Sequence, residues 1–174
     1  MLFRSARNAW LKGLSPRENR EIPPLRYDIV HRLKRDFPQL TIVINGGLRA
    51  HADSLAQLSH VDGVMIGREA CDNPWMLAEV DTLYYGQSGP VASREQAIES
   101  IRPFLEAEVA QGTSARAVLR HLLGLYNGLS GARRWRRTLS DSAVLARFGA
   151  GALDQALQAI VDARGQTAIN PGVN

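Results

Sequence analysis

Two glycine turns in the first half of the chain have the residue types that could carry chemistry. Asn45-Gly46-Gly47 follows the apolar run LTIVI, and Gly67-Arg68 follows the shorter run VMI. Glycine lets the backbone approach a ligand closely, so that N–H groups can point at an anion. The arginine adds a charge-assisted donor. Two such turns at consecutive strand ends predict a phosphate site, and a purely structural turn remains the alternative for each.

The second candidate is the arginine-rich stretch GARRWRR at residues 131–137. On a helix, Arg133, Arg136 and Arg137 would share one face. The stretch lies between Glu108 and Asp141, a window with six arginines and no acidic residue. This clustering favours a polyanionic partner, with a solvated helix face as the alternative.

Trp135 interrupts the arginine cluster, and two roles are open to it. Its ring could stack on a nucleobase or on an arginine plane. It could equally bury its ring in a helical core, and we favour burial.

The remaining reactive side chains give weaker signals. Cys71 is the only cysteine, so an internal disulfide and a CxxC zinc site are excluded. No histidine or lysine lies within a turn of it, so we expect a structural thiol. The four histidines lack metal-ligand spacing and no metal is expected. The sequence contains no GxSxG, HExxH or Walker motif.

The elements that must position these residues fall into two groups. Periodicity predicts a helix over 28–37, a buried strand over 40–44, a helix over 52–59, a second strand at VMI and a helix opening at Asn73-Pro74. This order is typical of the βα units of a parallel sheet or barrel. After the linker at 86–90, residues 92–110, 113–128 and 151–163 show helical periodicity only. The sequence therefore predicts an α/β part over 1–90 and an all-α part over 91–174.

Composition agrees with a folded protein that has a polyanionic partner. The 174 residues are 45% apolar and 22% charged, with a net charge of +4. No apolar run reaches the roughly 18 residues of a membrane span, so no membrane partner is expected. All but two of the 21 basic residues are arginines, which suit phosphate recognition but also reflect base composition in some genomes.

Several stretches resemble the A subfamily of tRNA-dihydrouridine synthases. They are ARNAWLKGLSP (6–16), NREIPPL (19–25), GVMIGREA (63–70) and GARRWRR (131–137). The resemblance covers about residues 5–164. It implies an FMN-binding TIM barrel followed by a helical tRNA-binding domain, in a cytoplasmic oxidoreductase. FMN reduced by NADPH would pass a hydride to a D-loop uridine, and a cysteine would protonate the other carbon of the base.

The resemblance assigns roles by position. The residues expected to bind the FMN phosphate are Asn45, Gly46, Gly47, Gly67 and Arg68. The residues expected to face tRNA are Arg17, Asn19, Arg20, Arg133, Arg134, Arg136 and Arg137. No catalytic residue is assigned, because the family's catalytic cysteine and FMN-contacting lysine lie upstream of the matching stretch and Cys71 does not correspond to either.

The departures from the family predict an incomplete enzyme. Ser5 stands where the family has a flavin-holding histidine, and Met1–Arg4 do not match. We therefore expect the C-terminal half of the family's chain, inactive alone, with an open barrel edge that self-associates or accepts an N-terminal half. Two alternatives stay open. One is a non-catalytic tRNA-binding fragment without flavin. The other is a phosphate-binding barrel acting on a small metabolite, which would not need the arginine cluster.

Overall fold

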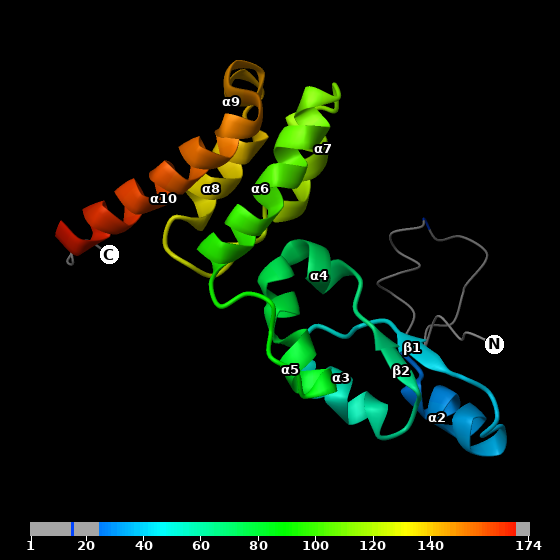
Figure 1. Cartoon of the computed structure of the whole chain (residues 1–174). Coiled ribbons are helices and arrows are strands. Elements are labelled where there is room, and N and C mark those ends of the chain that lie inside the picture. Colours follow the sequence, from blue (N-terminus) through cyan, green and yellow to red (C-terminus); the bar gives the residue numbers. More distant parts are fainter. Residues whose placement is uncertain (1–14, 16–24, 170–174) are drawn as a thin grey trace. The chain divides into compact units, whose positions relative to one another are not determined.

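The structure is a computed structural model that describes residue 15 and residues 25–169 (Figure 1). The chain divides into two compact units, Met1–Glu69 and Ala70–Asn174, and each is described by itself. None of the described helices is long and apolar enough to cross a membrane.

The first unit contains two helices and two short parallel strands. These are α2 (Tyr27–Asp36), β1 (Val43–Asn45), α3 (His51–Leu58) and β2 (Gly63–Met65). Val43 pairs with Gly63 and Asn45 with Met65, so β1 and β2 run in the same direction. The predicted order of helices and strands is confirmed. The predicted strand over 40–44 begins too early, because Leu40, Thr41 and Ile42 lie in the loop that leads into β1.

The core of the first unit is small, and a charged clamp closes the loop beside it. Its buried apolar side chains are Val30, Ile42, Ile44, Leu48 and Val61. Lys34 Nζ donates to the carbonyls of Pro38 (2.9 Å) and Leu40 (2.8 Å) and pairs with Asp62 Oδ2 (2.8 Å). Asp62 Oδ2 also accepts the backbone N–H of Ile42 at 2.8 Å. The three donors of one ammonium group therefore hold the α2–β1 loop.

The second unit is helical throughout its described part. The short helix α4 (Arg68–Asp72) crosses the division between the units and is followed by η1 (Pro74–Glu79) and α5 (Val80–Tyr85). The later elements are α6 (Arg94–Ala110), α7 (Ala115–Leu119), η2 (Arg120–Leu122), α8 (Ala132–Ser140), α9 (Ser142–Phe148), η3 (Gly149–Gly151) and α10 (Ala152–Ile169). Helices α8 and α10 pack side by side (Figure 1).

The helix predicted over 113–128 is wrong in its second half. The α-helix ends at Leu119, continues as a 3₁₀ turn to Leu122 and then becomes a series of turns. Gly124 explains this, because its Cα lies against the backbone of the α4–η1 junction. A Cβ there would overlap the carbonyl oxygen of Asp72 and lie 2.9 Å from Pro74 Cδ. Only glycine permits so close an approach.

The second unit has a much larger core than the first. Its fully buried side chains include Trp135, Tyr126, Ile98, Leu105, Leu119, Leu139, Leu153 and Ile160. Among the described residues, those after residue 90 form helices and turns only. The compact units divide at 69/70, whereas residue 90 lies in the loop between α5 and α6. The two-domain assignment at residue 90 stays a prediction.

Candidate functional sites

The carboxyl ends of β1 and β2 bring the two glycine turns to one edge of the sheet. Asn45 and Met65 are paired across the strands. The chain leaves β1 through Gly46 and Gly47, and it leaves β2 through Ile66 and Gly67. The turns that the sequence places at consecutive strand ends are therefore neighbours.

Gly46 and Gly47 have a structural reason to be glycine. Their φ angles are +121° and +72°, in the left-handed region that other residues avoid. A Cβ on Gly46 would lie 2.9 Å from Leu25 Cδ2, and one on Gly47 would overlap Leu25 Cδ1. The Tyr27 hydroxyl also donates to the Gly46 carbonyl. The turn is thus packed beneath Leu25 and Tyr27 whether or not a ligand binds.

The second turn, Gly67-Arg68, has no comparable structural explanation among the described residues. Gly67 is not in the left-handed region, and a Cβ there would meet no atom of the described residues within 4 Å. Arg68 is exposed and forms no ion pair with any carboxylate that the structure describes. Within the described part of the chain, the space at Gly67 is open and no carboxylate pairs with the Arg68 guanidinium, so the residues present fit a phosphate group at this edge.

Helix α8 separates its arginines from its apolar residues. Ala132, Trp135 and Leu139 are buried, while Arg133, Arg134, Arg136 and Arg137 are all exposed. Arg133, Arg136 and Arg137 pair with no described carboxylate. Arg102 on α6 is the contrast, because its hydrogen bonds to Glu99 and Asp154 raise the pKa of its guanidinium. Among the residues that the structure describes, these three arginines of α8 thus have no ion-pair partner that would explain them.

Trp135 is a core residue. Its side chain is 0% exposed, and its Nε1 donates to the carbonyl of Leu122 at 2.8 Å. Its ring centroid lies 4.9 Å from that of Tyr126, tilted by 58°. Burial, the favoured interpretation, is confirmed. Stacking on a nucleobase is excluded because the ring is not accessible.

An aromatic–arginine stack, which the sequence did not reveal, continues from Trp135. The Arg94 guanidinium lies 4.4 Å from the Trp75 ring centroid and 6.0 Å from that of Tyr126. Arg94 Nε donates to the Leu125 carbonyl at 2.7 Å, and the Tyr126 hydroxyl bonds Glu95 at 2.9 Å. The stack of Trp75, Arg94, Tyr126 and Trp135 fixes α8 relative to η1. These residues are far apart in the sequence, so no local pattern could show it.

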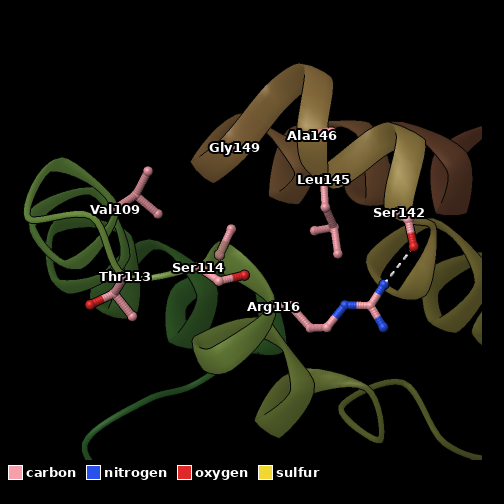
Figure 2. Close-up of a pocket in the computed structure, with 9 residues that line it drawn as sticks. Val109, Thr113, Ser114, Arg116, Ser142, Leu145, Ala146 and Gly149 are labelled. Atoms are coloured by element: carbon pink, nitrogen blue, oxygen red, sulfur yellow. Dashed lines mark hydrogen bonds between the residues drawn. The ribbon is translucent and has the colours of Figure 1, made fainter.

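A groove of about 520 Å³ opens between the start of α7 and helix α9 (Figure 2). Its lining residues are Val109, Thr113, Ser114, Ala115, Arg116, Ser142, Leu145, Ala146 and Gly149. Arg116 Nη2 donates to the Ser140 carbonyl (3.0 Å) and to Ser142 Oγ (2.9 Å). The sequence contains one signal for this groove. Arg116 is one of the six arginines in the stretch between Glu108 and Asp141, which has no acidic residue.

Comparison with known proteins identifies the family. The sequence profile described as "Dihydrouridine synthase (Dus)" matches residues 6–163. The chain belongs to the dihydrouridine synthase family. Both candidate sites that the structure describes lie inside the matched range.

Three relatives of this dihydrouridine synthase family member are named tRNA-dihydrouridine(20/20a) synthase. The protein of Vibrio cholerae is 50% identical over 155 residues, which are 89% of this chain and 47% of that protein. That of Escherichia coli K12 is 48% identical over 164 residues, 94% of this chain and 48% of its own length. The protein of Shewanella oneidensis is 54% identical over 138 residues, which are 79% of this chain and 41% of that protein. The chain spans about half the length of the curated relatives it matches.

The family match confirms the resemblance at the level of the family, and the A subfamily stays a prediction. Arg17, Asn19 and Arg20, expected to face tRNA, lie outside the described residues. Cys71 is an exposed free thiol, and no three His, Cys, Asp or Glu side chains gather as a metal site would need within residues 25–169. No described residue is assigned as catalytic in this dihydrouridine synthase family chain.

Proposed function

We propose that these residues belong to an A-subfamily tRNA-dihydrouridine synthase, a cytoplasmic oxidoreductase that reduces a D-loop uridine with FMN and NADPH. Residues 1–90 would supply the last βα units of a TIM barrel, and residues 91–174 a helical tRNA-binding domain. The observation that carries the proposal is the family match over 6–163, within which the strand-end turns and the arginines of α8 both lie. The names of the relatives support the substrate.

The strand-end turns would hold the phosphate of FMN. Backbone groups of Asn45, Gly46 and Gly47 would line one side, and Gly67 with the guanidinium of Arg68 the other. Two observations on the described residues support this arrangement: no atom lies within 4 Å of a Cβ built on Gly67, and no carboxylate pairs with Arg68. When bound, FMN supplies the hydride chemistry, and the protein supplies orientation and charge.

The exposed arginines of α8 would contact the tRNA backbone. Arg133, Arg134, Arg136 and Arg137 lie on the solvent side of a helix whose other side is anchored by Trp135. A rigid cationic surface of this kind binds phosphates without reading sequence. We also propose that Arg17, Asn19 and Arg20 contact tRNA.

A second candidate is a tRNA-binding protein without flavin. One observation favours it: Leu25 and Tyr27 account for Gly46 and Gly47 without any ligand. The α8 surface would function unchanged in such a protein. A flavin absorbance band in the purified protein would decide against it.

The deciding experiment tests the two halves of the enzyme separately and together. The 174-residue chain is incubated with FMN, NADPH and an unmodified tRNA transcript, alone and with the separately expressed N-terminal half of the Vibrio cholerae relative. We expect dihydrouridine only in the mixture, since the resemblance places the catalytic cysteine in that other half. The two-stranded sheet would accept the partner half, or a second copy, along its edge.

Turnover by the chain alone would contradict the assignment of the catalytic cysteine to the other half. Absence of turnover in a mixture whose halves bind each other, FMN and tRNA would contradict the proposed reaction. Failure of the chain to bind tRNA would contradict the role of α8.

A further inference from the structure

The groove between α7 and α9 has one charged side chain with a fixed orientation. Arg116 is exposed, and its Nη2 donates to the Ser140 carbonyl and to Ser142 Oγ. Figure 2 shows the bond to Ser142. Both acceptors are neutral oxygens. The Nε and Nη1 groups donate to no described atom, so the guanidinium is held in place with donors to spare.

The carboxylates nearest to the groove in sequence are already engaged. Glu108 Oε2 accepts the hydroxyl of Thr113 at 2.9 Å. Asp141 Oδ1 accepts the backbone N–H groups of Ala143 (2.8 Å) and Val144 (3.3 Å), which caps α9. Neither forms an ion pair with Arg116. The positive charge at the groove is therefore not neutralised within the described chain.

The rest of the groove combines apolar side chains with hydroxyl groups in about equal measure. Val109, Leu145 and Ala146 line it together with the hydroxyl-bearing Ser114 and Ser142 (Figure 2). Its volume of about 520 Å³ lies within the range of small-molecule sites. An apolar wall suits the face of a base, hydroxyls suit a ribose, and the guanidinium suits a phosphate.

The groove adjoins the last residue of α8 through Arg116. The carbonyl that holds Arg116 belongs to Ser140, the last residue of α8. Arg136 lies one turn before Ser140 on the same side of that helix. A polyanionic strand that follows α8 would therefore meet the groove at the end of the helix.

We propose that this groove is a nucleotide subsite for one unpaired nucleotide of a tRNA strand. The phosphate binds Arg116, and the nucleoside lies over Val109, Leu145 and Ala146. The proposal rests on the proposed function, because the strand is that of a tRNA bound along α8.

The test separates the charge of the groove from its shape. Binding of an unmodified tRNA transcript to the full 174-residue chain is measured across a salt series for the parent, Arg116→Gln, Ala146→Phe and Arg147→Gln. Ala146 is exposed, so phenylalanine there would fill the groove without disturbing the core. Arg147 lies outside the groove beside Phe148 and controls for the loss of one charge.

Arg116→Gln is expected to weaken binding about tenfold and to lower the salt slope by about 0.9. Ala146→Phe is expected to weaken binding several-fold with the slope unchanged, since it removes no charge. Arg147→Gln should stay within about twofold of the parent. Circular dichroism and thermal melting check that each variant folds. If Arg116→Gln does not fold, the result for Ala146→Phe decides the test.

Parent-like affinity and slope in both groove variants would overturn the subsite while leaving tRNA binding intact. Equal losses in Arg116→Gln and Arg147→Gln, with Ala146→Phe unaffected, would also overturn it in favour of diffuse charge. A parent chain that binds no tRNA would overturn the proposed function itself, and the subsite with it.

Discussion

The strand-end site and the α8 surface are built in opposite ways. The strand-end site depends on backbone turns, with one arginine beside them, in a unit whose core is five buried side chains. The α8 surface consists of side chains on one regular helix, above the larger core of the second unit. On α8, different residues fold the helix and contact solvent. At the strand ends, the positive φ angles and the contact with Leu25 already account for Gly46 and Gly47, so these glycines alone do not indicate a ligand.

The largest effect should come from removing the anchor of α8. Trp135→Ala removes a fully buried ring and leaves the Leu122 carbonyl without its donor. We expect a loss of about 3–5 kcal/mol in the free energy of unfolding, measured by urea denaturation. Arg133→Ala, two residues earlier and exposed, should stay within about 0.5 kcal/mol of the parent. Similar losses in the two variants would refute the separation of roles on α8.

Arg68 tests the strand-end site without touching its fold. Arg68→Ala removes an exposed guanidinium with no described carboxylate partner, so stability should not change. Affinity for FMN should fall by about 1.5–3 kcal/mol, or roughly 10- to 150-fold, measured by flavin fluorescence titration. The titration uses the chain together with the family's N-terminal half. Unchanged affinity would place the phosphate elsewhere.

Two glycines offer a matched pair. Gly124→Ala forces a Cβ into the Asp72 carbonyl and should destabilise the second unit by about 1–3 kcal/mol. The Cβ of Gly67→Ala meets no described atom within 4 Å, so this variant should keep the parent's melting temperature. Gly47→Val is not a clean probe of ligand binding, because the new side chain would clash with Leu25 first. A destabilised Gly67→Ala would mean that this turn also has a structural reason to be glycine.

The arginines of α8 should change the salt dependence of tRNA binding more than stability. Arg136→Ala combined with Arg137→Ala should lower the slope of log K against log salt by up to about two units, if each arginine neutralises one phosphate. The measurement is a filter-binding titration of unmodified tRNA at several salt concentrations. An unchanged slope would remove these two residues from the interface.

The smallest effect concerns the clamp at Asp62. The Ile42 N–H and then the Lys34 ammonium hold the pKa of this carboxyl below its ordinary value of 3.8. Because folding lowers this pKa, the ionised carboxylate stabilises the folded state at any pH above the pKa of the unfolded chain. That stabilisation is lost as the pH falls through the pKa of the folded state. The first unit should therefore weaken below about pH 4, as followed by hydrogen exchange. In Asp62→Asn, the stability of the first unit should depend less steeply on pH. An equally steep dependence in this variant would mean that other groups cause the loss of stability.

The sequence predicts the local parts of this structure well and the tertiary parts poorly. Apolar runs that end in glycine locate β1 and β2, and helical spacing separates Trp135 from its neighbouring arginines. The periodicity over 113–128 could not show that Gly124 contacts Asp72, because that contact joins residues about 50 positions apart. The Arg94 stack and the α7–α9 groove are missed for the same reason, since both arise from packing. Leu25 over Gly47 likewise has no local signal.

The burial of Trp135 gives the second unit an optical reporter. Its indole lies out of water, with its N–H bonded to a carbonyl and a tyrosine ring beside it. Such an indole emits at short wavelength and receives excitation energy from the nearby phenol. If α8 separates from its neighbours, the emission will move to the red and the transfer from Tyr126 will fall. The difference in emission between the parent and Trp135→Phe would isolate the signal of Trp135 from that of the other tryptophans. The packing of α8 on its neighbours can then be followed in real time while RNA is added.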